Sequence, residues 1–552
     1  MKTTFDLRAV VVGVALTFFL LASAGVTRAN VFASNVRLNG SASDAALYVP
    51  CGQVTISYLL NEPATAGVTV EILRGDTVVF SQVFAGGGPG AERGQNTFVW
   101  DGHDTSHTLV PLTNYTVRIT AAAHGYGKWT QISDDFNPGN YAWHPTSIAV
   151  NSNTNSPDYG RVFVANASPG PNPGFNVGDL VGLLKLNADG SRASEGAFST
   201  GGWPWAGDGF SPWKLEVSAD DHLYAHDWAS NVVLRFDQRI SSESRLEVWS
   251  AANQPDGAAN FTGLSIAGSG TNIWLSMADA SLTNSLGIRR WPIGQDGRVA
   301  AGDFGLTTVE VGTNSDLTIA PYDLTVDASN RTYTIQYREA AGDPAPRVLC
   351  FPPHTNGVPA LTNTEWKVGS TNNSMRGASG VAVDREGRYV AVAFAGALVN
   401  GFWTGGRTTV FDAATGAVVT NLVTDLPGGE SHRHLDVAWD NVGNLYDVDN
   451  YQGLWRVYSP PGSNAAVTVA LAPLRVTEPP LAPILAALGH ANGRFEFSLT
   501  GRTNVTYIIQ ASTNFSDWTP VATNAPEPCS TRVVSVPATG ERSFYRATPA
   551  LP

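Results

Sequence analysis

Histidine and aspartate side chains stand at related places along this 552-residue chain, and their types suggest metal chemistry. Imidazole nitrogens and carboxylate oxygens are ligands for zinc, calcium and manganese. A metal held by such groups can activate water or polarise a carbonyl group. The candidate metal ligands are His144, His226, Asp227, His434 and Asp449.

A structural interpretation competes with the metal site. Asp227 and Asp449 can cap turns, and the histidines can hydrogen-bond to loop backbone. The sequence contains no His-Glu-x-x-His motif, no Gly-x-Ser-x-Gly turn, no phosphate-binding loop and no complete calcium loop. We therefore assign no catalytic residue and no cofactor, with a divalent metal as the alternative.

A second candidate site is an indole-rich segment, "GGWPWAGDGFSPW". Exposed indoles can stack on sugar rings or on peptide side chains, with packing over a sheet as the alternative. Lys214 follows this segment directly, and Arg376 stands at a related place further along the chain. The candidate ligand-binding residues are Trp203, Trp205, Trp213, Lys214 and Arg376.

The overall charge excludes one class of partner. The formal net charge is −13 and the sequence pI is about 5.2, and no cluster of Lys and Arg offsets this balance. Such a chain repels a phosphate backbone. We expect no nucleic-acid partner.

An internal repeat must position these candidate residues. "VAWDNVGNLYDVDNYQGLWRVYS" stands 222 positions after "LEVSADDHLYAHDWASNVVLRFD" without a gap. Each copy alternates apolar and polar residues, reaches a polar turn and resumes with an aromatic strand, which predicts a β-hairpin. The copies begin at Ile148, Leu215, Leu264, Leu324, Val381 and Val437.

The turns within the copies repeat their chemistry. Three copies place an aspartate at one turn position, and Asn or Gly, which tolerate positive φ, three residues later. A second turn in four copies gives two hairpins, and so four strands, per copy. The aspartates are Asp327, Asp384 and Asp440, and the later turn residues are Asn330, Gly387 and Gly443.

Four-stranded units at this period are typical of the blades of a β-propeller. We predict an all-β chain with six blades over residues 124–475, with seven blades as the alternative, flanked by two small β-sandwich domains. In a propeller, loops that enter the innermost strands and loops that leave the second strands open on one face. That rule would gather the candidate residues.

The units also resemble NHL repeats. "YAHDWASNVVLRFD" and "YDVDNYQGLWRVYS" match that family's Asp, Asn and closing aromatic, with Gly453 as a departure from the pattern. The resemblance implies a propeller and no particular activity. Six-bladed propellers of the gluconolactonase and amidating-lyase kinds bind a metal at the loop face. The matching residues are Asp227, Asn231 and Phe236, and Asp449, Gly453 and Tyr458.

Two further modules flank the repeats. Residues 31–123, through Asn96, Trp100-Asp101-Gly102 and "YTV", resemble the immunoglobulin-like domain of flagellar hook-capping (FlgD-type) proteins, a module reused in secreted bacterial proteins. Residues 476–484 form a Pro-rich linker. Residues 485–552, with "YIIQASTNFSDW" and "FYR", look like the β-sandwich tails of secreted bacterial proteins, which implies an accessory or attachment module.

The N-terminus is typical of an export signal. Lys2 and Arg8 precede an apolar run that ends in small residues, so residues 1–24 are predicted as a signal peptide, with cleavage after Ala29 as the alternative. No later segment is long and apolar enough to span a bilayer. Cys51, Cys350 and Cys529 are too widely spaced for a disulfide framework. We expect a secreted or cell-surface protein.

These observations favour an exported, non-catalytic binding or scaffold protein whose propeller face recognises an extracellular carbohydrate or protein. The alternative is a metal-dependent hydrolase or lyase that acts on a lactone or polysaccharide at the central channel. Convergence of three or more of the candidate His, Asp and Asn side chains on one point would favour the alternative.

Overall fold

The computed structural model describes residues 30–43, 45–49, 52–171, 179–255, 259–337, 348–369, 375–399, 402–422, 431–478, 483–491, 493–502, 505–524, 532–537 and 543–550. Apart from two 3-10 turns, Pro138–Asn140 (η1) and Ala251–Asn253 (η2), the regular elements of these residues are β-strands. The all-β prediction is confirmed. In this part of the chain no helix has the length and apolar character needed to cross a bilayer. The predicted signal peptide lies outside the described residues.

The chain divides into two compact units. The first contains the described residues up to Val31, Ala122–Asn153 and Gly160–Ala466. The second contains Phe32–Ala121, Thr154–Tyr159 and the described residues from Val467 onward.

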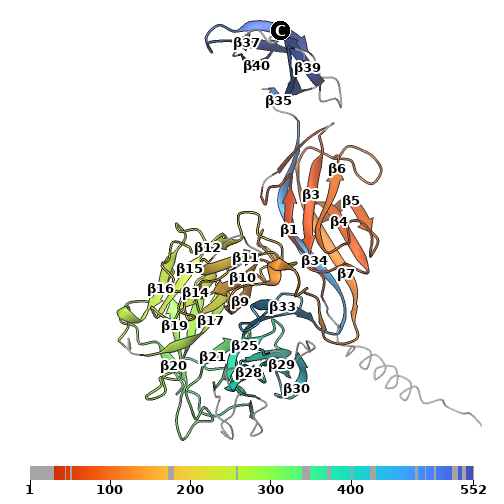
Figure 1. Ribbon diagram of the computed structural model, residues 1–552. Helices are drawn as coiled ribbons and strands as arrows, with labels where there is room; N and C mark the ends of the chain where they lie inside the picture. The colour runs from red at the N-terminus through yellow and green to blue at the C-terminus, as the bar shows by residue number, and fades with distance from the viewer. Residues whose placement is uncertain are drawn as a thin grey trace, which may run out of the picture. The chain divides into compact units, whose positions relative to one another are not determined.

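The described residues of the first unit form six four-stranded sheets, coloured from orange through green to blue in Figure 1. The first three are β9 (Pro145–Val150), β10 (Val162–Asn166), β11 (Gly182–Leu186) and β12 (Phe198–Ser199); β13 (Lys214–Val217), β14 (Leu223–Asp227), β15 (Val232–Phe236) and β16 (Leu246–Ser250); and β17 (Phe261–Ser269), β18 (Asn272–Asp279), β19 (Ile288–Ile293) and β20 (Leu306–Val309).

The other three sheets follow in the sequence, and the fifth carries an extra hairpin, β27 (Ala397–Val399) and β28 (Phe402–Thr404). They are β21 (Asp323–Val326), β22 (Thr332–Ile335), β23 (Val348–Phe351) and β24 (Trp366–Val368); β25 (Ala378–Val383), β26 (Tyr389–Phe394), β29 (Arg407–Asp412) and β30 (Val418–Leu422); and β31 (His434–Trp439), β32 (Leu445–Asp449), β33 (Leu454–Ser459) and β8 (Thr130–Gln131).

The first strands of these sheets close a ring. β9, β13, β17, β21, β25 and β31 contact one another in that order, and β31 contacts β9. Sheets stacked in this way bury both faces of their strands, so every residue of β10 and β14 is buried. The predicted propeller is confirmed.

The ring is completed by a strand from before the first sheet. Gln131 and Thr130 of β8 pair with Tyr458 and Ser459 of β33. The sequence also suggests pairing of residues 465–474 with residues 127–133, and that prediction is wrong. Residues 465–474 instead belong to β34, which lies between β2 and β7 in a five-stranded sheet.

The turn chemistry expected from the repeat is present. The Asp440 carboxylate accepts backbone hydrogen bonds from Val442 (3.0 Å) and Asn444 (2.9 Å). Gly443 has φ 92°, a region where a side chain would be strained. Each such turn fixes the register of its hairpin.

The second unit has four sheets. Trp100 is buried, and its ring centroid lies 6.0 Å from that of Tyr115, which belongs to a different sheet. The sheets are β1 (Ala33–Leu38), β3 (Val54–Leu60) and β6 (Gly94–Trp100); β2 (Ala45–Tyr48), β34 (Gly462–Thr477), β7 (Asn114–Tyr126), β4 (Gly67–Arg74) and β5 (Thr77–Phe84); β35 (Ile484–Ala491), β36 (Arg494–Thr500) and β39 (Arg532–Pro537); and β38 (Thr519–Asn524), β37 (Tyr507–Ser512) and β40 (Phe544–Pro549).

The cysteines match the expectation of isolated thiols where the structure describes them. Cys350 is a buried free thiol on β23. Cys51 and Cys529 lie outside the described residues.

Candidate functional site

A buried ammonium group lies where the first strands of the ring meet. Lys214, the first residue of β13, is 2% exposed. Its Nζ donates to Asp323 (2.9 Å), to Asp436 (2.7 Å) and to the carbonyl of Ser379 (3.1 Å). These partners come from the fourth, sixth and fifth sheets, none of which is next to the second sheet in the ring. The Lys214 side chain therefore reaches across the ring axis.

The repeat register explains which residues meet there. Lys214 and Asp436 each stand directly before the apolar residue that opens a copy, and so does Ser147, whose hydroxyl donates to Asp436 and accepts from Leu215 N (2.8 Å). Glycine occupies this position in two copies, because a Cβ at Gly263 would lie 2.7 Å from Asp323 Cα and one at Gly380 would lie 2.6 Å from Asp436 Cα. We call Ser147, Lys214, Gly263, Asp323, Gly380 and Asp436 the axis cluster.

The charged side chains of the axis cluster shift the pKa values of Lys214 and Asp323. Burial by itself lowers the pKa of Lys214, but the carboxylates of Asp323 and Asp436 raise that pKa above its ordinary value. Burial raises the pKa of Asp323 to about 6, with Lys214 opposing the rise and Asp436 reinforcing it. The Asp323 carboxylate also accepts from Val381 N (3.1 Å). The ionised groups at the axis are thus engaged within the protein.

A second polar cluster belongs to the sixth sheet. His432, His434 and Asp449 are all buried, and each offers a ligand atom within 4.8 Å of the others. His432 Nδ1 lies 2.6 Å from the Asp449 carboxylate, and His434 Nδ1 lies 2.7 Å from that of Asp447. The same Asp449 oxygen accepts from Arg456 (3.2 Å). Two imidazoles and a carboxylate resemble a three-ligand metal site.

The fit of this cluster to a metal is incomplete. His434 Nε2 is buried and has no hydrogen-bond partner among the described residues, which suits a ligand. However, the Arg456 guanidinium places a positive charge on the carboxylate oxygen that a dication would need. Burial by itself would raise the pKa of Asp449, but the hydrogen bond from His432 and the charges of His434 and Arg456 hold that pKa well below its usual range. These contacts already neutralise the carboxylate.

The structure brings two of the five predicted metal ligands together, His434 and Asp449, and adds His432. His226 is buried in β14, where burial lowers the pKa of its imidazole to about 4 and keeps it neutral. Asp227 accepts a hydrogen bond from Trp203 Nε1 (2.7 Å).

His144 is not part of the cluster of His432, His434 and Asp449. Its ring centroid lies 4.8 Å from that of Trp143, and its backbone has φ 48°. The predicted set omitted His432. The sequence could have indicated this residue, because His432 stands two residues before His434 at the same strand entrance.

The predicted ligand-binding tryptophans are largely interior. Trp205 and Trp213 are 9% and 2% exposed, and their indole N–H groups donate to the carbonyls of Thr200 and Thr262 (both 3.0 Å). Trp203 is half-buried, with Arg245 5.7 Å from its ring. Packing over the sheet therefore describes Trp205 and Trp213.

The two predicted cations also differ in access. Lys214 is engaged in the axis cluster, so it is not accessible to an external ligand. Arg376 is half-buried, and its carbonyl accepts from Gly396 N (3.1 Å).

Aromatic side chains gather on the loops at one end of the sheets. The Trp228 ring lies 4.7 Å from Phe210, 5.0 Å from Trp213 and 6.4 Å from Tyr322, which lies 4.8 Å from Tyr337. Phe210 is 43% exposed, and only Trp213 is fully buried. We call these five residues the aromatic face cluster. Their loops enter β13 and β21 or leave β14 and β22, as the topology rule predicts.

The sequence carried a signal for this cluster that residue-by-residue reading missed. Trp228 directly follows β14, and Tyr322 directly precedes β21. Aromatic residues at these two kinds of loop position are expected to meet once the loops share a face.

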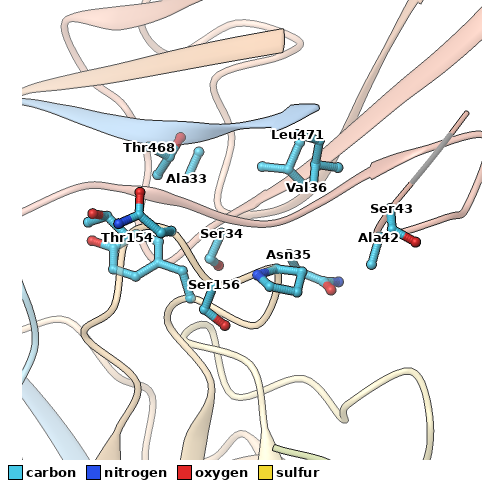
Figure 2. Close-up of a pocket in the computed structure, with 13 residues that line it drawn as sticks. Ala33, Ser34, Asn35, Val36, Ala42, Ser43, Thr154, Ser156, Thr468 and Leu471 are labelled. Atoms are coloured by element: carbon cyan, nitrogen blue, oxygen red, sulfur yellow. The ribbon is translucent and has the colours of Figure 1, made fainter. Parts of the chain in front are cut away.

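A pocket of about 240 Å³ lies within the second unit. Figure 2 shows Ser34 and Asn35 of the β1 segment beside Ser156, with Thr468 and Leu471 of β34 above them. Its lining contains no Asp, Glu, His, Lys or Arg, so it offers no group for acid–base chemistry at neutral pH.

No protein-family model and no curated protein matches the sequence. Among solved structures, a Bacteroides thetaiotaomicron protein of unknown function shares 12% identity, over 78% of this chain and 98% of that chain, with a TM-score of 0.38. The soluble aldose sugar dehydrogenase of Escherichia coli shares 12% (60% and 99% covered, TM-score 0.38), and a streptogramin B lyase shares 9% (60% and 97%, TM-score 0.34). Identities and TM-scores at this level give no information on the activity of this chain.

Proposed function

We propose that this chain is an exported, non-catalytic binding or scaffold protein, secreted or held at the cell surface. The aromatic face cluster is its recognition surface, and its partner is an extracellular carbohydrate. Half-exposed aromatic rings supply the flat apolar surface on which sugar rings stack.

The observation that carries this proposal is the contrast between the loop face and the strands beneath it. Phe210 is exposed, and Trp228, Tyr322 and Tyr337 are half-buried. The ionisable groups of the axis cluster are buried in ion pairs with one another. Accessible apolar rings support recognition, whereas a catalytic acid or base must reach the substrate.

Binding to immobilised polysaccharides tests the recognition surface. We expect the wild-type protein to be retained and Trp228→Ala to bind about tenfold more weakly, because that ring contacts three others of the cluster. Phe136→Ala removes an aromatic ring that is 92% exposed elsewhere and serves as the control. Equal retention of Trp228→Ala and wild type would contradict the assignment, and binding only to a protein partner would replace the carbohydrate.

The second candidate function is a metal-dependent hydrolase or lyase, which the His432, His434 and Asp449 cluster favours. In that case the two imidazoles and the carboxylate would hold the metal, which would supply Lewis-acid chemistry. The ligand atoms of these three residues lie within 4.8 Å of one another, which meets the criterion of three converging side chains. The contact of Arg456 with Asp449 opposes metal binding.

Metal analysis separates the two functions. Under our proposal, purified protein carries no stoichiometric metal, and added zinc, calcium or manganese leaves its Tm unchanged at neutral pH. A bound metal, or a rise in Tm that His434→Ala abolishes and His144→Ala retains, would favour the enzyme instead.

A further inference from the structure

A pocket of about 400 Å³ opens between the third and fourth sheets of the ring. Trp274, Ser276 and Arg290 line it from one face of the third sheet, since Ser276 and Arg290 are paired residues of β18 and β19. The segment after β23 closes the other side with His354 and Asn356. The volume falls within the range of small-molecule binding sites.

The pocket holds polar groups that the protein itself satisfies only in part. His354 is 6% exposed, and its ring nitrogens lie near the backbone of Val358 and Pro359 but make no hydrogen bond of ordinary geometry within the part of the chain that the structure describes. The Nε atom of Arg290 is likewise buried without a partner. Polar groups that are not fully hydrogen-bonded within the protein can bond to a ligand that enters the pocket.

The charge of the pocket selects the kind of ligand. Arg290 donates to Asn356 (2.8 Å) and lies 4.7 Å from the Trp274 ring, and no ion pair among the described residues includes it. No Asp or Glu lines the pocket, although the chain carries a net charge of −13. A guanidinium positioned by an indole can donate two parallel hydrogen bonds to a planar carboxylate.

We propose that this pocket binds a small hydroxylated carboxylate, of the size and chemistry of a uronic acid. Arg290 and His354 donate to the carboxylate. Ser276, Thr355 and Asn356 supply hydroxyl and amide groups for the ligand's own hydroxyls. The site lies apart from the aromatic face cluster in its residues, and it does not depend on the recognition function proposed above.

Calorimetric titration of the full chain with glucuronate tests the proposal, with glucose as the neutral comparison. We expect glucuronate to bind with a Kd of about 1 mM or tighter and glucose to show no binding. Inorganic phosphate that competes with glucuronate would support the oxyanion position. Absence of binding by glucuronate and galacturonate, or equal binding of glucose, would overturn the proposal.

Two variants locate the site. Arg290→Met is expected to weaken glucuronate binding at least about tenfold. Arg289→Met is the matched control, because it changes the adjacent residue of β19, whose side chain points to the other face of the sheet. Equal weakening by both variants, or by neither, would contradict the assignment.

His354→Leu distinguishes a binding role from a structural one. It removes two buried nitrogens that make no hydrogen bond of ordinary geometry within the described residues, so we expect the Tm to change little while glucuronate binding is lost. A lower Tm with unchanged binding would show that His354 serves the fold, and would overturn its role in the site.

Discussion

The ring contains cationic side chains in two regions that differ in whether a carboxylate pairs with the cation. At the axis, Lys214 is buried against Asp323 and Asp436, so each charge is answered by another. In the pocket between the third and fourth sheets, Arg290 contacts an amide and an indole, and no carboxylate among the described residues pairs with it. The same architecture therefore uses buried polarity for cohesion in one place and leaves it open to a ligand in the other.

The largest effect is expected at the axis. Lys214→Ala leaves two carboxylates buried without their cation, so the free energy of unfolding should fall by about 3–5 kcal/mol. Urea unfolding measures this loss. Lys367→Ala is the control, because Lys367 is half-exposed in its pair with Asp316 and should cost no more than about 1 kcal/mol. A loss below about 1 kcal/mol for Lys214→Ala would remove the cohesive role from the axis cluster.

The pH dependence of stability sharpens the contrast. The folded pKa of Asp323, about 6, lies above its ordinary value of 3.8, so this group's stabilising contribution is complete below pH 4 and is lost as the pH rises through 6. The loss is on the order of 3 kcal/mol for the fully buried group. The free energy of unfolding, measured from pH 4 to 7, should fall more steeply with pH for wild type than for Asp323→Asn.

The control variant for this measurement is Phe136→Ala. It should keep the wild-type slope between pH 4 and 7, because it removes a 92% exposed ring and leaves unchanged both the axis carboxylates and His354, whose pKa burial and the charge of Arg290 both lower. Identical slopes for wild type and Asp323→Asn would show that Asp323 does not titrate with folding.

A turn aspartate lies between the two extremes. Asp440→Ala should cost about 1 kcal/mol through lost turn hydrogen bonds, without effect on ligand binding. Thermal unfolding and polysaccharide retention measure the two quantities. Loss of ligand affinity at an unchanged Tm would refute the structural assignment.

The smallest stability effect is expected in the pocket. Arg290→Met should change the free energy of unfolding by less than about 1 kcal/mol, because it removes an exposed hydrogen bond to Asn356 and the contact with Trp274 but breaks no ion pair. Chemical denaturation checks this value. A loss comparable to that of Lys214→Ala would erase the distinction between the two regions.

The sequence determined the parts of the structure that depend on neighbours along the chain. Alternating residues within each copy predicted the strands, and Asp440 with Gly443 predicted a tight turn, because both depend on local backbone geometry. The register of the copies also contained the axis cluster, since Lys214 and Asp436 hold the same position 222 residues apart.

Tertiary structure alone decided which side chains meet across the ring. Lys214 looked like a ligand-binding cation, but its long side chain reaches carboxylates of two other sheets once the ring closes. The closing strand β8 pairs with β33, whereas β34 belongs to another sheet. The indole N–H groups of Trp205 and Trp213 donate to backbone carbonyls. Local periodicity is blind to such contacts, because they join residues that only the closed ring brings within hydrogen-bonding distance.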